Sequence, residues 1–218
     1  MKNSFFIILL LSFLKASLHA EELFIEAKDV SLNKNNKTTI FKDDVVIKLK
    51  NKEIISQFAE YNKETEKIVL RKNIIAKDEL NNIVKTEYAE YNKLKDTLTT
   101  VGTSTFTSSE NYTLDGENLF FDNQNKKVRS KSKALLKDPD GNKIYLENFE
   151  YLINDNIFKS LGNIKIIDKL NNNYEFSQIY IDTKKREIIG SDSQTFFNNE
   201  DFKLNEKNNP RIFSNTVK

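Results

Sequence analysis

An internal repeat is the feature that most restricts how this chain can fold. The string Ala59-Glu60-Tyr61-Asn62-Lys63 recurs thirty positions later as Ala89-Glu90-Tyr91-Asn92-Lys93. Looser copies place an apolar residue directly before Asn or Asp. These apolar residues are Leu32, Tyr61, Tyr91, Phe121, Ile153 and Ile181, at steps of 29, 30, 30, 32 and 28. Self-similarity at a fixed period indicates a stack of one supersecondary unit, so about six units cover residues 23 to about 197.

Each unit combines a turn signal with strand signals. The Asn- or Asp-centred clusters, such as Asn62 to Glu66 and Asp122 to Lys127, are typical of tight turns. The runs beside them alternate with period 2: Ile68, Leu70, Ile74 and Ala76 alternate with Lys67, Arg71, Asn73 and Lys77. Such alternation indicates half-buried strands joined by hairpins. We therefore predict an all-β protein of about six strand-turn-strand units.

Glycine and proline content favours one kind of β-architecture. The chain has 5 Gly and 2 Pro, which disfavours Gly-rich parallel coils and favours long, regular antiparallel strands. Gly102, Gly162 and Gly190 fall inside the predicted strand runs. Glycine within a strand indicates a bulge or a close approach of another group to the backbone.

The N-terminus predicts export. Lys2 gives a short positive head, Phe5 to Leu14 is an apolar run, and Ala20 is a small residue before two glutamates. This apolar run is too short to span a membrane and is typical of a secretory signal peptide. We predict a signal peptide over residues 1–20, with an uncleaved anchor as the alternative.

Charge and reactive residues exclude several function classes. The chain has 34 Lys and Arg against 32 Asp and Glu. Lys2 and Lys15 lie in the predicted signal peptide, so the remainder is neutral, without the positive excess that nucleic-acid binding needs. Cysteine is absent, and the single histidine, His19, leaves with the signal peptide. Ser-His-Asp catalysis, Cys-His catalysis and His-based zinc sites are therefore excluded from the mature chain.

These units resemble a known family. The features that carry the resemblance are the length of the unit, the inward Ala or aromatic residue before the Asn or Asp turn, and glycine-marked strands such as Leu161-Gly162-Asn163-Ile164-Lys165-Ile166. Together they resemble the OstA-like (organic solvent tolerance-like) domain of the lipopolysaccharide transport proteins LptA and LptD. On this resemblance the domain covers residues 21–213, and residues 214–218 form a C-terminal tail.

The resemblance implies a fold and a role. The fold would be an open-ended, repetitive antiparallel β-jelly roll whose apolar groove shields lipopolysaccharide acyl chains in the periplasm, as a bridge protein or as the N-terminal part of an LptD translocon. The implied partners are lipopolysaccharide, outer-membrane translocon components and other OstA-like jelly-roll domains stacked edge to edge. The expected edge strands are Leu23 to Leu32 and Ile188 to Phe197. The location would be the periplasm, with or without attachment to the outer membrane, and neither enzymatic activity nor a cofactor is implied.

Strand alternation supplies the candidate lipid-contacting residues. The inward positions are Tyr61, Leu70, Ala89, Tyr91, Leu119, Phe121, Tyr151 and Ile153. The same positions fit a plain sealed core, and alternation alone does not separate the two. The acids Asp43-Asp44 and Asp138-Pro139-Asp140-Gly141 are interpreted as solvated turn residues, so we predict no catalytic or metal site.

Two other classes of function stay open at this stage. One is a structural or protein-binding β-solenoid without lipid cargo. The other is an enzyme on a β-helix scaffold that works with carboxylates and lysines, although the loss of the only histidine weakens it. An apolar interior open to solvent would favour transport, whereas a closed core with an exposed carboxylate cluster would favour catalysis.

Overall fold

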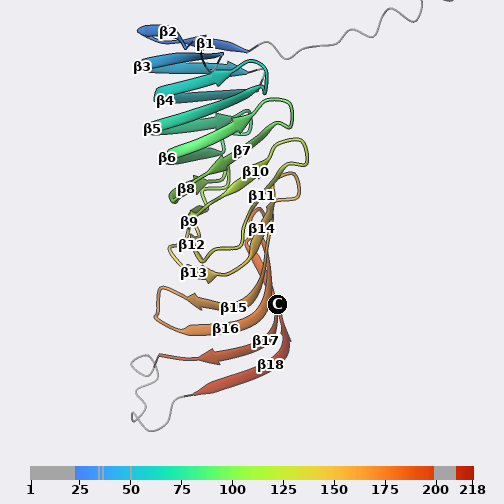
Figure 1. Cartoon of the computed structure of the whole chain (residues 1–218). Coiled ribbons are helices and arrows are strands. Elements are labelled where there is room, and N and C mark those ends of the chain that lie inside the picture. The colour runs from blue at the N-terminus through green and yellow to red at the C-terminus, as the bar shows by residue number, and fades with distance from the viewer. Residues whose placement is uncertain (1–22, 34, 36, 50, 199–209) are drawn as a thin grey trace, which may run out of the picture.

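The computed structural model of the chain describes residues 23–33, 35, 37–49, 51–198 and 210–218 (Figure 1). The predicted signal peptide, residues 1–20, lies outside the described residues. The described residues form strands and turns only, which confirms the all-β prediction. Among them there is no helix with the length and apolar character that a membrane crossing requires.

The first seventeen strands follow one another with short connections. Their bounds are β1 Phe24–Glu26, β2 Asp29–Asn33, β3 Thr38–Leu49, β4 Lys52–Asn62, β5 Lys67–Asp78, β6 Ile83–Asn92, β7 Thr97–Thr100, β8 Thr103–Thr107, β9 Thr113–Glu117, β10 Phe120–Asp122, β11 Lys127–Ser130, β12 Ala134–Lys137, β13 Lys143–Leu146, β14 Phe149–Leu152, β15 Ile157–Ile167, β16 Asn173–Asp182, β17 Glu187–Phe196 and β18 Arg211–Val217.

All the strand pairs are antiparallel and make one long meander. Strands β3 to β6 pair consecutively, as do β15 to β18. Between them the long strands are interrupted, so that β7 and β8 both pair with β6, and β10 and β9 continue from them. Figure 1 shows β7, β10, β11 and β14 on one side of the molecule and β8, β9, β12 and β13 on the other. The predicted repetitive antiparallel fold is confirmed.

A bend near the middle of each long strand folds the sheet over on itself. The strand register shifts between Lys42 and Val45 in β3, and between Arg71 and Ile74 in β5. Residues at these shifts have positive φ, including Asp43, Asp44, Lys72 and Asn73. An extra residue in one strand bends it and increases its twist. The two halves of each strand therefore form two layers with a single interior between them.

Two of the three glycines that suggested irregular strands lie at these bends. Gly102, between β7 and β8, has φ 77°, and Gly162, at the register shift of β15, has φ 119°. Gly190 has a different role, because a Cβ atom there would overlap the Phe176 ring. The predictions of a bulge and of a close approach are both confirmed.

From Tyr61 onward the repeat in the structure is 30 residues long, and the first step, from Leu32 to Tyr61, is 29 residues long. Positions Tyr61, Tyr91, Phe121, Tyr151 and Ile181 are equivalent, each five residues before a turn residue with positive φ. Those turn residues are Glu66, Asp96, Lys126, Asn156 and Arg186. The sequence alignment on Ile153 was therefore out by two residues, because Tyr151, not Ile153, occupies the repeat position. Its hydroxyl donates to Asn156 Oδ1 at 3.4 Å, as Tyr61 and Tyr91 donate to Glu66 and Asp96 at 2.8 and 2.9 Å.

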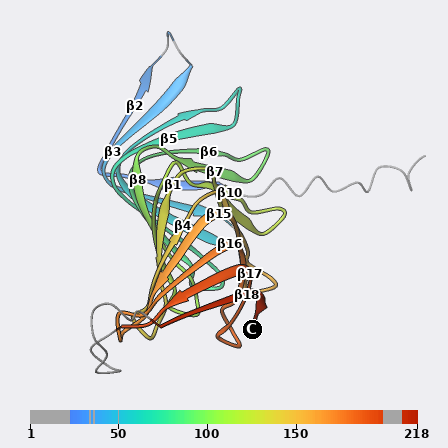
Figure 2. The same cartoon turned by 90° about the horizontal axis from the view of Figure 1, so that it is seen from below.

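The hairpin turns form two rows along the molecule. The first row of turns comprises residues 63–66, 93–96, 123–126, 153–156 and 183–186, and the second row comprises residues 79–82, 109–112, 139–142 and 169–172. Backbone hydrogen bonds join successive turns of the first row: Lys93 N to Glu66 O at 2.9 Å, Asn123 N to Asp96 O at 3.1 Å, Ile153 N to Lys126 O at 2.9 Å and Thr183 N to Asn156 O at 2.8 Å. Successive hairpins are rotated relative to one another (Figure 2), as expected from the twist of β-sheets.

Three of the four turns of the second row share one side-chain motif. Asp78, Asp138 and Asp168 each accept hydrogen bonds from the backbone and side-chain amides of Asn82, Asn142 and Asn172 respectively, at 2.6 to 2.9 Å. Such local bonds stabilise a turn by satisfying its backbone groups. The interpretation of Asp138 and its neighbours as turn residues agrees with this geometry.

The core lies between the two layers. Phe106 of β8 contacts Phe121 of β10 and Tyr151 of β14, with ring centroids 5.8 Å apart in both pairs. Tyr151 also stacks on Phe158 of β15 at 4.1 Å. Since β8 belongs to one layer, and β10, β14 and the first half of β15 belong to the opposite layer, this cluster holds the two layers together.

The ends of the meander have edge strands. Strands β1 and β2 pair only with β3, and β18 pairs only with β17, among the described residues. The first edge is the predicted one. The second prediction, Ile188 to Phe197, is wrong because that segment is β17 and β18 covers it. Residues 214–217, which we expected in a terminal tail, belong to β18.

Gly190 provides a test of the packing. We expect Gly190→Ala to lower the free energy of unfolding by about 1–3 kcal/mol, because the added methyl group would displace the Phe176 ring from its place in the core. Urea denaturation measures this loss. In the double variant Gly190→Ala/Phe176→Leu, the loss of unfolding free energy should be smaller than the sum of the losses in the two single variants, because the smaller Leu side chain removes the overlap. Full additivity would contradict this account.

Candidate functional site

The eight candidate residues lie in the interior, mostly sealed from solvent. Seven are buried and one, Tyr61, is half-buried. The buried ones are Leu70, Ala89, Tyr91, Leu119, Phe121, Tyr151 and Ile153. They come from both sides of the first row of turns and are part of one continuous core. The structure thus brings them together, as the alternation indicated.

Little space remains among these side chains. The space beside Tyr91, Phe121 and Ile153 has a volume of about 40 Å³, far below the roughly 300–1,000 Å³ of typical ligand pockets. The middle of the interior is therefore packed like an ordinary protein core. An acyl chain could enter there only if the two layers moved apart.

The interior opens toward the C-terminal end. A pocket of about 600 Å³ lies between the two layers at the level of β16 to β18, and Ile166, Tyr174, Phe176, Ile188 and Val217 supply its apolar lining. Ligand pockets in proteins typically measure about 300–1,000 Å³. This end of the interior can thus hold a small ligand or part of a larger one.

Charged residues accompany this apolar lining. Arg186 and Lys218 line the same pocket with Asp168 and Glu187. Lys218 Nζ is 3.3 Å from Glu187 Oε1, and Arg186 Nη1 is 3.5 Å from Asp140 Oδ2. An apolar pocket with cations beside it suits a molecule that combines a hydrocarbon chain with an anionic group.

Asp168 and Tyr174 form a polar pair within the pocket. The Tyr174 hydroxyl donates to Asp168 Oδ2 at 2.9 Å. Burial, followed by the hydrogen bond to Asp168 and its negative charge, raises the pKa of Tyr174 to about 12. Burial alone would raise the pKa of Asp168, but the hydrogen bonds from Asn172, Tyr174 and Leu170 outweigh it and lower that pKa. Asp168 is therefore an ionised carboxylate that is stabilised by hydrogen bonds from neighbouring protein groups, and it is not a proton donor.

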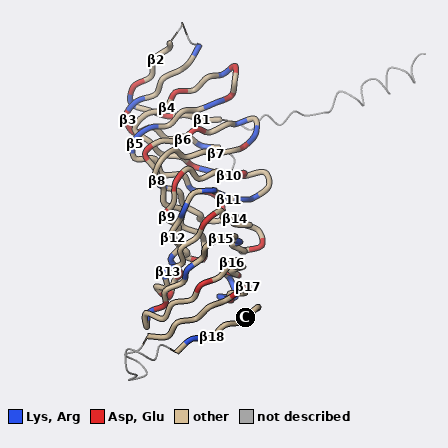
Figure 3. Tube along the Cα trace, turned by 60° about the horizontal axis from the view of Figure 1, so that its bottom comes forward, with Lys and Arg blue, Asp and Glu red and all other residues tan. Residues whose placement is uncertain are grey.

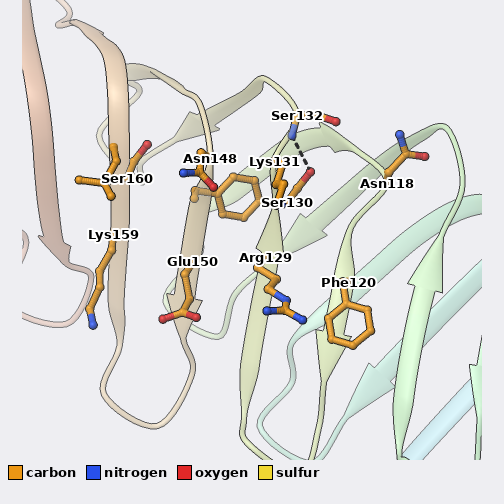
Figure 4. A pocket seen from close by; sticks show the side chains of 12 residues that line it. Asn118, Phe120, Arg129, Ser130, Lys131, Ser132, Asn148, Glu150, Lys159 and Ser160 are labelled. Carbon is orange, nitrogen blue, oxygen red and sulfur yellow. Dashed lines mark hydrogen bonds between the residues drawn. The ribbon is translucent and has the colours of Figure 1, made fainter.

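The outer face carries separate depressions that follow the bends of the strands. The one in Figure 4 has a volume of about 700 Å³ and lies across β10, β11, β14 and β15. Its lining combines Phe120, Arg129, Glu150 and Lys159, and Arg129 lies over the Phe120 ring at 4.8 Å. A neighbouring depression of about 940 Å³ shares Lys131 and Ser132 with it. Their mixed charges fit contact with water or a polar surface better than contact with acyl chains.

Charges of both signs are interspersed along the whole trace (Figure 3). The basic residues therefore do not gather into a single-sign surface of the kind that phosphate backbones require. In the described part of the chain no group of three or more acidic residues is arranged to hold a metal ion.

Sequence reasoning missed the charged residues that join the two rows of turns. Lys52 contacts Asp96, Lys126 contacts Glu79, and Arg186 contacts Asp140. The partners are 44 and 47 residues apart in the first two pairs, or about one and a half repeats. A search for opposite charges at one and a half times the repeat length would have found them.

Comparisons with known proteins give matches among solved structures. No family model matches the sequence, and a comparison with curated proteins gives no match. The structure of LptH, the LptA homologous periplasmic component of the conserved lipopolysaccharide transport device from Pseudomonas aeruginosa, aligns with 89% of this chain and 96% of its own chain. The identity is 10% and the TM-score is 0.23. Because these values are low, the fold described above rests on its own strand pairings.

The raised pKa of Tyr174 predicts a pH dependence. The unfolded chain releases this proton near pH 10, whereas the folded chain keeps it to about pH 12. The free energy of unfolding should therefore fall as pH rises from 10 toward 12. Thermal melts across this range should show a shallower fall for Tyr174→Phe than for the unmodified protein. Tyr145→Phe, at an exposed position, is the control, and equal slopes for all three proteins would refute the prediction.

Proposed function

We propose that the chain is a periplasmic lipid-binding module of lipopolysaccharide transport, which shields acyl chains inside its folded sheet. The observation that carries this proposal is the opening of the apolar interior into the 600 Å³ pocket, with Arg186 and Lys218 among its lining residues. Burying hydrocarbon gains about 0.8 kcal/mol per methylene group, and Arg and Lys bind phosphate groups. An amphiphile with several acyl chains and phosphates matches both features.

The candidate residues of the packed interior extend the proposed path. Tyr91, Phe121 and Tyr151 lie on the same continuous core as the pocket residues Ile166 and Phe176. When the layers separate, these apolar side chains would form the walls of a groove along the molecule. Contacts with such walls are non-directional, which suits a cargo that must bind and then move on.

The edge strands supply the proposed means of stacking. Phe213 of β18 is 64% exposed, and Val30 and Leu32 of β2 are also exposed. Unpaired strand edges bind other strands by extending the sheet. A second jelly-roll domain would thus continue the interior from one module to the next, as far as the translocon components of the outer membrane.

A structural or protein-binding role without lipid cargo is the second candidate. The observation in its favour is the small volume of the cavity beside Tyr91 and Phe121. Under this role the interior would serve only to stabilise the fold, and lipid would not co-purify. The two functions therefore differ in a measurable property.

Lipid binding is tested by two neighbouring residues of β17. Ile188 lines the pocket, whereas Ile189 is 43% exposed on the outer face. We expect lipopolysaccharide to co-purify with the protein from a periplasm that contains it, and we expect Ile188→Glu to reduce the bound amount at least tenfold. Mass spectrometry of bound lipid is the measurement, and circular dichroism checks the fold. Ile189→Glu should bind normally. A folded, lipid-free unmodified protein would favour the structural role.

Stacking is tested at the C-terminal edge. We expect Phe213→Lys to weaken concentration-dependent self-association at least tenfold, since a charge on an edge strand opposes pairing with a second copy. Sedimentation velocity over a concentration series measures this. Leu161→Lys places the same charge on β15, which is paired on both sides, and should leave association unchanged. Equal association of both variants would argue against edge stacking.

A further inference from the structure

Three ion pairs join the two rows of turns across the mouth of the interior. Lys52, beside the second row, binds Asp96 of the first row, with Nζ 2.6 Å from Oδ2. Glu79 of the second row lies 3.4 Å from Lys126 of the first row. Asp140 of the second row lies 3.5 Å from Arg186 of the first row. Each pair spans the line along which the folded sheet would have to part.

The spacing of these pairs follows from the twist of the sheet. A turn of the second row faces the first-row turn that begins 44 residues later, not its nearest neighbour in sequence. Twist between adjacent strands shifts one row relative to the other along the molecule. The same shift relates the two members of each of the three pairs, so the positions of these pairs follow from the repeat of the fold.

The pairs differ greatly in burial. The side chains of Lys52 and Asp96 are 15% and 18% exposed, those of Lys126 and Glu79 are 31% and 45% exposed, and those of Arg186 and Asp140 are 58% and 53% exposed. Asp96 also accepts hydrogen bonds from Tyr91 at 2.9 Å and Asn123 at 3.0 Å. Ion pairs weaken with exposure because water screens them. The mouth is therefore held most firmly at its N-terminal end.

Space in the interior follows the same gradient. Lys52 and Asn123 border the cavity of about 40 Å³. Arg186 borders the pocket of about 600 Å³. The weakest pair thus lies beside an end of the interior that already has room for a ligand.

We propose that these three pairs form a graded latch, which opens from the C-terminal end and admits an anionic amphiphile sideways between the rows of turns. The inference rests on the proposed lipid-binding function and adds the route and direction of entry. An anionic group on the cargo would replace Asp140 as the partner of Arg186. The hydrocarbon chain would then pass into the pocket and separate the layers progressively toward Glu79 and Lys126.

Isosteric variants test the latch without lipid. Asp96→Asn and Asp140→Asn each remove one charge while keeping the shape of the side chain, and Asn tolerates the positive φ of residue 96. Hydrogen exchange of the turn amides is the measurement. We expect Asp96→Asn to speed exchange around residues 93–96 at least tenfold, and Asp140→Asn to change exchange around residues 183–186 less than twofold. Asp122→Asn, within one turn, is the control. Equal effects at both pairs, or no effect at Asp96, would overturn the proposal.

Cross-linking tests the direction of entry. Since the chain has no cysteine, cysteines introduced at positions 139 and 185, in the turns that carry Asp140 and Arg186, or at 51 and 95, beside Lys52 and Asp96, can be joined by a short bis-maleimide while all three ion pairs are kept. We expect the 139/185 link to lower lipopolysaccharide loading at least tenfold relative to the unlinked variant, and the 51/95 link to lower it less than twofold. Equal losses, or no loss, with normal loading of the unlinked variants would overturn the latch and leave the proposed function intact. If the unlinked variants fail to load, the proposed function is wrong, and hydrogen exchange alone decides whether the latch exists.

Discussion

The bend in the middle of each long strand is the constraint on which the rest of the structure depends. A meander with one apolar face must cover that face, and this chain covers it by folding the sheet over on itself. The bends leave backbone groups without strand partners, and hydroxyl side chains bind several of them. Thr100 Oγ1 accepts from Leu119 N at 3.0 Å, and Ser130 and Ser160 donate to Glu117 O and Glu147 O at 2.8 and 2.7 Å. Because these hydrogen bonds pair buried backbone groups, they lower the free-energy cost of burying the bend.

The same repeat that places the bends also places the turns. Because each turn of the first row donates a backbone hydrogen bond to the one before it, the hairpins cannot slide independently of one another. A register slip of one residue would exchange the buried and exposed faces of a strand. The ladder of turns, with the tyrosine bonds at Tyr61 and Tyr91, therefore fixes the register along the first row and keeps the opposite charges aligned across the mouth.

Sequence alone predicted the features that are local in the repeat. Strand alternation gave the inward residues, and the shared string at Tyr61 and Tyr91 gave the period. The step to Ile153 was misplaced because Tyr151 and Ile153 both lie inward and both precede polar residues. The C-terminal edge was misassigned because β18 follows residues 199–209, where the sequence carries no repeat signal. The ion pairs across the mouth depend on how far the twist of the sheet displaces one row of turns relative to the other. Neither sequence periodicity nor strand propensity predicts this displacement.

A carrier of hydrocarbon faces opposing demands in its empty and loaded states. An empty groove lined by apolar side chains would leave them in water at a cost of about 25 cal/mol for each Å², so the interior must close when no cargo is present. A core closed as tightly as a structural one would admit nothing. Under the proposed function, the two demands would be met at different ends of one interior, because the Lys52 end is packed and firmly paired, and the Arg186 end is open and weakly paired. Closure can then propagate along the repeat, one turn at a time, instead of requiring the whole sheet to open at once.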